Sequence, residues 1–222
     1  AQMKPSLVEK CILVVGSLIF LFGIFLFHYD RTFFEAKYVV EDGMVEWITV
    51  VFLLIGSGIC FRRFLIHRKS KPWLFLVGTL GLSLLFFFGA GEEISWGQRI
   101  FDIKSPAFFV QNNSQMETNI HNLILEGTKI NRIIFGLILG IAIGLYLLVL
   151  PFLHGRVTWV KTWVQKFALP LPQLYQILSY IALALLAELV SSGKKGELLE
   201  FGGCLLFFLI IWQPANKKDL GF

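Results

Sequence analysis

The stretch PWLFLVGTLGLSLLFFFGAGEEISWGQRIF, residues 72–101, decides the fold of this chain. Its apolar part runs from Trp73 to Gly91 without a charged residue. That length approaches the ~20 residues with which a helix crosses a bilayer. Two adjacent carboxylates, Glu92 and Glu93, end the run. The stretch therefore predicts a membrane span that carries polar chemistry at one end.

The composition of the whole chain supports a lipid environment. Of the 222 residues, 56% are hydrophobic and 16% are charged, whereas soluble domains have about 25% charged residues. Cys11, Cys60 and Cys204 lie in apolar runs without metal-ligand spacing, so we interpret them as small core residues. The net charge of +5 forms no basic stripe. We therefore expect membrane lipids, and no nucleic acid, as partners.

Further apolar runs along the chain predict an all-α fold, a polytopic membrane helical bundle with six transmembrane helices and short interfacial helices. We expect the natural chain to begin at Met3 and to form a single transmembrane domain, residues 3–222, with a retained first span. Amphipathic spacing around Val160 and Trp163 predicts one interfacial helix. The predicted spans cover about residues 11–28, 44–61, 73–91, 130–153, 174–190 and 197–212.

The distribution of charge predicts the orientation of the spans, because cytoplasmic loops accumulate Lys and Arg. With the N-terminus inside, 12 of the 20 basic residues lie on the inner side. Of the 15 acidic residues, only Glu9 and Asp219 then lie inside. We therefore expect both termini in the cytoplasm.

Carboxylates recur at the predicted outer ends of the spans. A charged carboxylate at the bilayer centre costs roughly 2.5–3.5 kcal/mol, so a shared polar cavity is one explanation and separate pairing in the headgroup region is the other. In the first case the polar segment 102–127 forms an outer lid, with short helices that begin at Ser105-Pro106 and at Ser114. The residues predicted to converge are Glu46, Glu92, Glu93, Glu117, His121, Glu188 and Glu200.

The pair Glu92 and Glu93 suggests acid–base chemistry. Neighbouring carboxylates separate their pKa values, which leaves one as a base and one as an acid. Arg99 either takes part in that chemistry or binds one carboxylate as a structural counter-ion. Together with His121, these residues are the candidate catalytic residues.

Glu117 and His121 lie four residues apart, which places them on one face of a helix. They are candidates for an acid and its base, or for metal ligands together with Glu46 and Glu93. One histidine with several carboxylates suits a divalent ion such as Mg, Mn, Fe or Zn. Alternatively, Ser114 and Glu117 form a capping box at a helix start.

Three sequence blocks resemble a family of uncharacterised bacterial multi-pass inner-membrane proteins. They are EDGxxEW from Glu41, EExSWGQ from Glu92 and QxExNIHN from Gln115. The resemblance implies that these blocks belong together and that the chain resides in a bacterial inner membrane.

The first of the paired glutamates also begins a sequence similar to the EExxxR helix of CAAX-type glutamate intramembrane proteases. In that family paired glutamates and later histidine motifs activate water. Gly97 stands at the position of the arginine, and no FxxxH or HxxxN motif follows. The resemblance therefore implies a role for Glu92 and Glu93 alone.

Three classes of function remain open. The first is a hydrolase or transferase at the outer leaflet that acts on a lipid or lipid-linked substrate. The second is a cation- or proton-coupled transporter, and the third is a non-catalytic subunit of a membrane complex. Gly136, Gly140 and Gly144 lie at four-residue spacing. Such spacing lets another helix approach closely, so it predicts a helix-packing partner.

Overall fold

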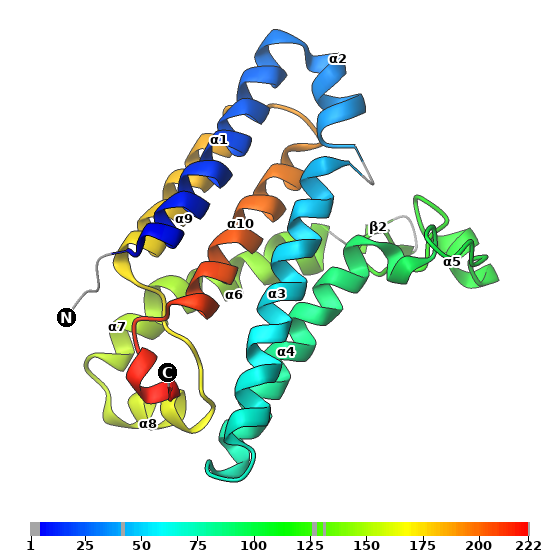
Figure 1. The fold of residues 1–222 in the computed structure, drawn as a ribbon. Coiled ribbons are helices and arrows are strands. Elements are labelled where there is room, and N and C mark those ends of the chain that lie inside the picture. The colour runs from blue at the N-terminus through cyan, green and yellow to red at the C-terminus, as the bar shows by residue number, and fades with distance from the viewer. Residues whose placement is uncertain (1–4, 41–42, 126–127, 131, 222) are drawn as a thin grey trace.

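The computed structural model describes residues 5–40, 43–125, 128–130 and 132–221, whose regular structure is helical apart from one short hairpin (Figure 1). The all-α prediction is thereby confirmed. The α-helices are α1 (Leu7–Tyr29), α2 (Arg31–Phe33), α3 (Met44–His67), α4 (Trp73–Glu93), α5 (Ala107–Asn112), α6 (Leu139–Gly144), α7 (Leu150–His154), α8 (Thr158–Lys166), α9 (Leu174–Ala187) and α10 (Lys195–Trp212). The π-helical segments are η1 (Phe34–Tyr38), η3 (Arg132–Ile138) and η4 (Leu145–Val149), and the 3-10 segments are η2 (Ser95–Gly97) and η5 (Lys217–Leu220). The antiparallel strands are β1 (Ile124–Leu125) and β2 (Thr128–Lys129).

Four helices among the described residues are long and apolar enough to cross a membrane. They are α1, α3, α4 and the continuous run Gly136–His154. Helix α1 begins with the capping box that the S-x-x-E spacing of Ser6 and Glu9 predicts, ahead of the predicted span 11–28. The Ser6 hydroxyl accepts from the Glu9 amide at 3.3 Å, and the Ser6 amide donates to the Glu9 carboxylate at 2.8 Å. The chain thus has the helices of a multi-pass membrane protein.

The other two predicted spans correspond to α9 and α10. Helix α9 has 14 residues, fewer than the ~20 that a bilayer requires. Helix α10 has 18 residues and begins with three charged side chains, Lys195, Glu197 and Glu200. These two helices therefore lack the length or the composition of the other four.

The fourth predicted span differs from the expected helix over residues 130–153. Thr128, predicted to cap it, instead pairs with Leu125 in the hairpin. The helical run that follows alternates between π and α geometry. Few of its residues pack against the rest of the protein, since 6% of the residues in its most apolar 18-residue stretch are buried. A methyl group added at Gly140 or Gly144 would meet no atom within 4 Å. The predicted packing role of this glycine stripe stays a prediction.

Helix α10 is the centre of the core. It packs against α1, α3 and α9 (Figure 1), and Leu198, Phe201 and Leu209 on it are almost completely buried. Gly202 lets α9 approach closely, because a Cβ at this position would lie 2.5 Å from a methyl group of Leu183. Such contacts hold helices together in lipid, where apolar burial alone gives no preference for protein neighbours.

One end of the bundle, formed by α8, η5 and residues 168–173 and 213–216, is named here the closed end. The Asn216 side chain accepts from the Leu171 amide at 2.9 Å and donates to the Leu169 carbonyl at 2.9 Å. The Gln173 side chain donates to the Gln213 carbonyl at 2.8 Å. The predicted interfacial segment forms α8, whose Val160 faces the bundle. Side-chain amides thus tie the loops of this end to one another.

Candidate functional site

A cleft of about 530 Å³ opens at the other end of the bundle, named here the cleft end. Five separate segments of the chain supply its walls. These are the residues after α1, the start of α3, the end of α4 with Arg99, the polar segment, and the turn between α9 and α10. The lining residues are Arg31, Glu35, Glu46, Glu93, Arg99, Gln115, Glu117, Asn119, His121, Asn122, Ser192, Gly193, Lys194, Gly196, Glu197 and Glu200.

A left-handed turn at the end of α4 shapes one side of the cleft. Ser95, Trp96 and Gly97 have φ values of 47°, 56° and 74°. Non-glycine residues rarely adopt this geometry, and it costs about 1–3 kcal/mol at each. The turn directs the Trp96 indole back onto α4, where its N–H donates to Glu92 at 3.0 Å. Gly91 leaves room for the ring, because a Cβ there would lie 2.8 Å from it.

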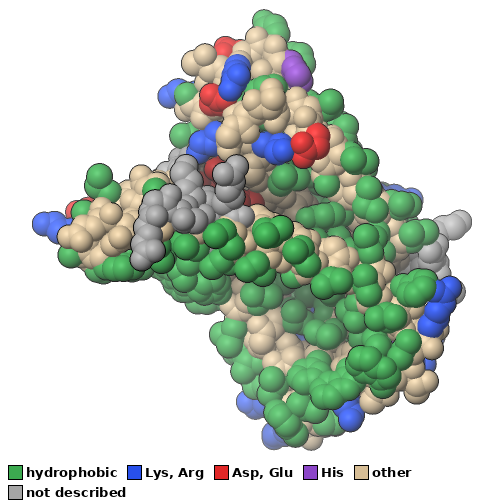
Figure 2. Space-filling model, turned by 180° about the vertical axis from the view of Figure 1, so that it is seen from behind, with side chains coloured by type: hydrophobic (Ala, Val, Ile, Leu, Met, Phe, Trp, Pro, Cys, Tyr) green, Lys and Arg blue, Asp and Glu red, His purple; other side chains and the backbone are tan. Residues whose placement is uncertain are grey.

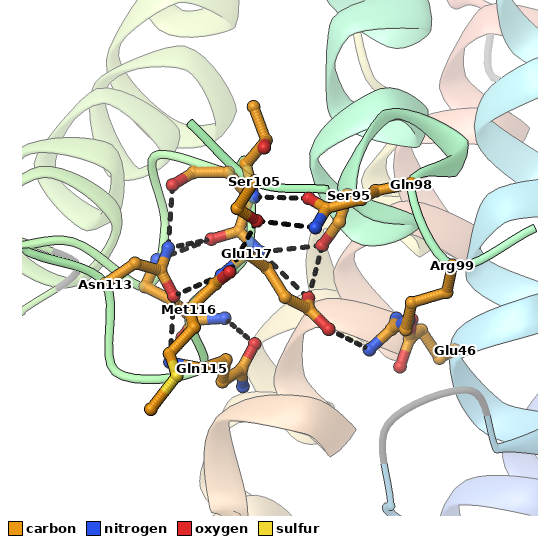
Figure 3. A network of polar contacts seen from close by, with 12 residues as sticks. Glu46, Ser95, Gln98, Arg99, Ser105, Asn113, Gln115, Met116 and Glu117 are labelled. Atoms are coloured by element: carbon orange, nitrogen blue, oxygen red, sulfur yellow. Dashed lines mark hydrogen bonds and ion pairs between the residues drawn. The ribbon is translucent and has the colours of Figure 1, made fainter. Parts of the chain in front are cut away.

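Of the described residues in the segment 102–127 that was predicted as a lid, only residues after α5 line the cleft, and residues 113–123, named here the lid, fold against this turn. The backbone amide of Thr118 donates to Gln98 at 2.8 Å, and the Asn119 side chain donates to the Ser95 hydroxyl at 2.8 Å. Asn113, almost buried, donates to the Asn119 carbonyl at 3.0 Å (Figure 3). Side chains at the end of α4 thus fix the backbone of the lid.

The local structure predicted for the lid segment is only partly present. The helix expected after Ser105-Pro106 is α5. The helix expected at Ser114 is wrong, because the chain there forms turns held by Asn113, whose side chain accepts from the amide of Gln115 at 2.8 Å. The capping box of Ser114 and Glu117 is therefore also wrong.

Glu92 lies beneath the lid and is saturated with hydrogen bonds. One oxygen accepts from the Trp96 indole, and the other accepts from the backbone amides of Ile120 at 2.6 Å and His121 at 3.2 Å. The His121 Nδ1 atom lies 3.8 Å from that second oxygen. The structure thus brings together Glu92 and His121, which lie 29 positions apart in the sequence. The arrangement leaves Glu92 suited to orient the imidazole rather than to exchange protons itself.

His121 is held at both ring nitrogens. Its Nε2 atom lies 3.0 Å from the side-chain nitrogen of Asn122, opposite the contact with Glu92. Burial disfavours the charged ring, but the hydrogen bond to Glu92 and the nearby carboxylates of Glu200 and Glu197 outweigh burial and raise the pKa of His121. The ring therefore carries a proton to a higher pH than an ordinary histidine does.

Arg99 joins the lid to α3. Its guanidinium donates to Glu117 at 2.8 Å and lies 3.5 Å from Glu46 (Figure 3). Glu117 also accepts from the Ser95 hydroxyl at 2.5 Å. Arg99 is thus a counter-ion to two of the predicted metal ligands.

The proposed metal ligands line one cleft without forming a compact ligand set. Within the described part of the chain, no three His, Cys, Asp or Glu side chains lie close enough together to hold a metal ion. Glu117 and His121 share the cleft but not a helix, contrary to prediction. The metal site stays a prediction.

An acidic wall faces the lid across the cleft. Glu93 from α4 and Glu200 from α10 share a narrow extension of the cleft with Glu46 and Glu197. Glu197 also pairs with Lys194 at 3.4 Å. Glu197 was not predicted, although its three-residue spacing from Glu200 places both on one helical face and could have indicated it.

At the rim, the loop after α1 meets the turn between α9 and α10. The carboxylate of Glu35 accepts from the Ser192 hydroxyl at 2.6 Å and from Arg31 at 2.9 Å. These two contacts hold the pKa of Glu35 below its ordinary value. The bond from Ser192 joins two segments that are 157 positions apart in the sequence.

Glu188 does not join the cleft, contrary to prediction. Its side chain is 67% exposed and forms an ion pair of 2.9 Å with Lys195. The described α9 helix ends at Ala187, so Glu188 caps that helix and points outward. Glu41 and Asp42, which begin the first of the three sequence blocks, lie outside the described residues.

Comparisons with protein-family models, curated proteins and solved structures find no match for this chain. The assignment of function therefore depends on the geometry of the cleft.

Proposed function

We propose that this chain is a membrane enzyme of the hydrolase or transferase class that acts on a lipid or lipid-linked substrate at the outer interface. The observation that supports the proposal is the juxtaposition of His121, oriented by Glu92, with the carboxylates of Glu93 and Glu200 around one open volume of about 530 Å³. General acid–base catalysis needs such groups within reach of one substrate. The position of the cleft at the helix ends supports the remaining requirement, which is access from the membrane.

The geometry suggests a role for each group. In its neutral form His121 takes a proton at Nε2 from a water or hydroxyl nucleophile that displaces the Asn122 amide there, while Glu92 fixes the ring and stabilises the imidazolium that forms. Glu93 supplies the proton to the leaving group, since neighbouring carboxylates such as Glu93 and Glu200 readily share one. Arg99 holds Glu117 and thereby keeps the lid in place.

We also propose that the chain crosses a bacterial inner membrane six times, with α9 and α10 as the last two spans and both termini in the cytoplasm. All the loops predicted to lie outside contribute to the cleft, and those predicted to lie inside meet at the closed end. The blocks that carry the family resemblance supply Glu46, Glu93 and His121 to the cleft.

Cysteine labelling tests this topology in a background without the native cysteines. An impermeant reagent added outside should label a cysteine at Ser192 and spare one at Ser70. Labelling of Ser70 from outside would overturn the arrangement.

The enzymatic proposal is tested by incorporating the purified protein into liposomes of bacterial lipid extract and following lipid species by mass spectrometry. The variants His121→Ala and Glu93→Gln should each lower turnover of the consumed lipid by about 100-fold or more. The control Glu188→Gln alters a carboxylate outside the cleft and should retain activity. Full turnover in both cleft variants contradicts the proposal and favours a non-catalytic subunit. Cation flux into the same liposomes is measured in parallel. If the unmodified protein converts no lipid but carries a flux that the cleft variants lose, the chain is a transporter.

A further inference from the structure

Residues 100–112, named here the arm, leave the bundle sideways. The left-handed turn at Ser95, Trp96 and Gly97 ends α4, and a further left-handed residue, Asp102, redirects the chain again. The arm ends in α5, which stands clear of the other helices in Figure 1. Because these backbone conformations are strained at non-glycine residues, the sideways course is built into the fold.

The arm exposes large apolar side chains. Phe101 is 72% exposed, Ile103 57% and Phe108 52%. Isolated exposed apolar residues are common on proteins, but a contiguous group marks a surface that contacts something other than water. The exposed surface of the arm therefore suits an apolar neighbour rather than bulk water.

The apolar surface of the arm continues that of a candidate membrane span. At the outer end of α4, Phe87 and Phe88 are exposed and lie edge-on to the Trp96 ring, which is itself 42% exposed. Figure 2 shows that the lower edge of the arm is hydrophobic and runs into the hydrophobic surface of the bundle. Lipid that covers α4 would thus meet the arm without a polar interruption.

The arm is also amphipathic. On α5 the apolar residues Phe108, Phe109 and Val110 cover a broad side centred on Phe109, and Gln111, two residues after Phe109, falls on the opposite side. A short helix with this distribution suits the boundary between headgroups and acyl chains.

We propose that the arm lies in the lipid–water interface of the outer leaflet, with its apolar side in the bilayer. The arm begins directly after the turn that carries Trp96, and that indole is bonded to Glu92 beneath the lid. An arm anchored in the interface therefore holds the cleft mouth at the depth of the lipid headgroups. The proposal depends on α4 crossing a bilayer and not on the chemistry of the cleft, so the two can fail separately.

The test uses spin labels on single cysteines at Phe109 and Gln111, which lie on opposite sides of α5, after replacement of Cys11, Cys60 and Cys204. The full-length protein is placed in vesicles of phosphatidylethanolamine and phosphatidylglycerol. The measured quantity is the ratio of collision rates with oxygen, which partitions into lipid, and with a water-soluble nickel complex. We expect this ratio to be several-fold higher at Phe109 than at Gln111.

A third label at Leu85, exposed on α4, serves as a reference for a side chain within the bilayer, and circular dichroism verifies the fold of each variant. If Leu85 reports lipid while Phe109 reports as much nickel contact as Gln111, the arm extends into water and the proposal is overturned. If Phe109 is shielded from both reagents, protein covers this side of the arm, and the proposal is overturned as well.

Discussion

The two ends of the bundle are held together by different kinds of contact. At the closed end, side-chain amides of Asn216 and Gln173 bond to backbone groups of neighbouring loops. At the cleft end, charged side chains bond to one another around an open volume, and Arg99 joins Glu46 to Glu117 across it. The difference shows that the contacts at the closed end hold the helices together. The cleft end can therefore carry charged side chains that a compact apolar core would exclude.

Helix α4 joins the two ends and carries a closely packed glycine near each. A Cβ at Gly78 would lie 1.8 Å from the backbone carbonyl oxygen of Phe167 at the closed end. A Cβ at Gly91 would lie 2.8 Å from the Trp96 ring at the cleft end. A backbone group held by its neighbours cannot move away as a side chain can, so the two ends should respond differently to the same substitution.

The largest effect is expected for Gly78→Ala. The added methyl group must displace the chain after α8, and overpacking of this kind costs about 1–3 kcal/mol or more. We expect the free energy of unfolding, measured by denaturant titration in mixed micelles, to fall by about 3 kcal/mol.

The matched control is Gly81→Ala on the same helix. Nothing lies within 4 Å of a Cβ at Gly81, so its stability should change by less than about 1 kcal/mol. Equal stability of the two variants would show that the closed end is not tightly packed.

Gly91→Ala is expected to lower the free energy of unfolding less than Gly78→Ala does, but to change the structure of the cleft more. Its methyl group displaces the Trp96 indole, which removes the hydrogen bond to Glu92 at a cost of about 1–2 kcal/mol. Trp96 fluorescence, isolated by comparison with a Trp96→Phe background, should shift, and lipid turnover should fall. Gly89→Ala is the control, because its nearest contact is an ordinary 3.5 Å to Leu53. Unchanged fluorescence in Gly91→Ala would argue against close packing of the indole on Gly91.

The smallest effect concerns pH and belongs to the cleft end alone. The pKa of His121 is raised in the folded protein, so its contribution to stability is complete below the ordinary value of 6.5 and is lost as pH rises through the raised value. The difference in unfolding free energy between the natural chain and His121→Gln should therefore shrink as pH rises through this range. A difference that grows with pH would mean that the ring is neutral beside Glu92.

Prediction from sequence succeeded where the signal is local. Apolar length marks α3 and α4, and the Ser6–Glu9 pattern marks the start of α1. A lid was predicted, but its course could not be, because that course depends on left-handed Ser95 and Trp96, which no residue preference indicates.

Two glutamates near the turn between α9 and α10 show that local sequence signals could not identify every member of the candidate site either. Glu188 and Glu197 flank one turn, since Glu188 directly follows one apolar helix and Glu197 lies in the first turn of the next. Only the packing of α9 against α10 decides that Glu197 faces the cleft while Glu188 pairs outside it with Lys195. Convergence of distant carboxylates follows from their cost in lipid, but the identity of each member depends on tertiary contacts.

The position of Glu197 and Glu200 on the last long helix has a consequence for biosynthesis. A ribosome makes the chain from its N-terminus at roughly 5–20 residues per second, so roughly 5–20 s separate the appearance of Glu93 from that of Glu200. During that interval Glu46 and Glu93 are already translated, while α10, which forms one wall of the cleft, has not yet been made. The cleft thus cannot be completed before α10 is made, and a nascent chain that is interrupted before α10 leaves both carboxylates in an unfinished membrane intermediate.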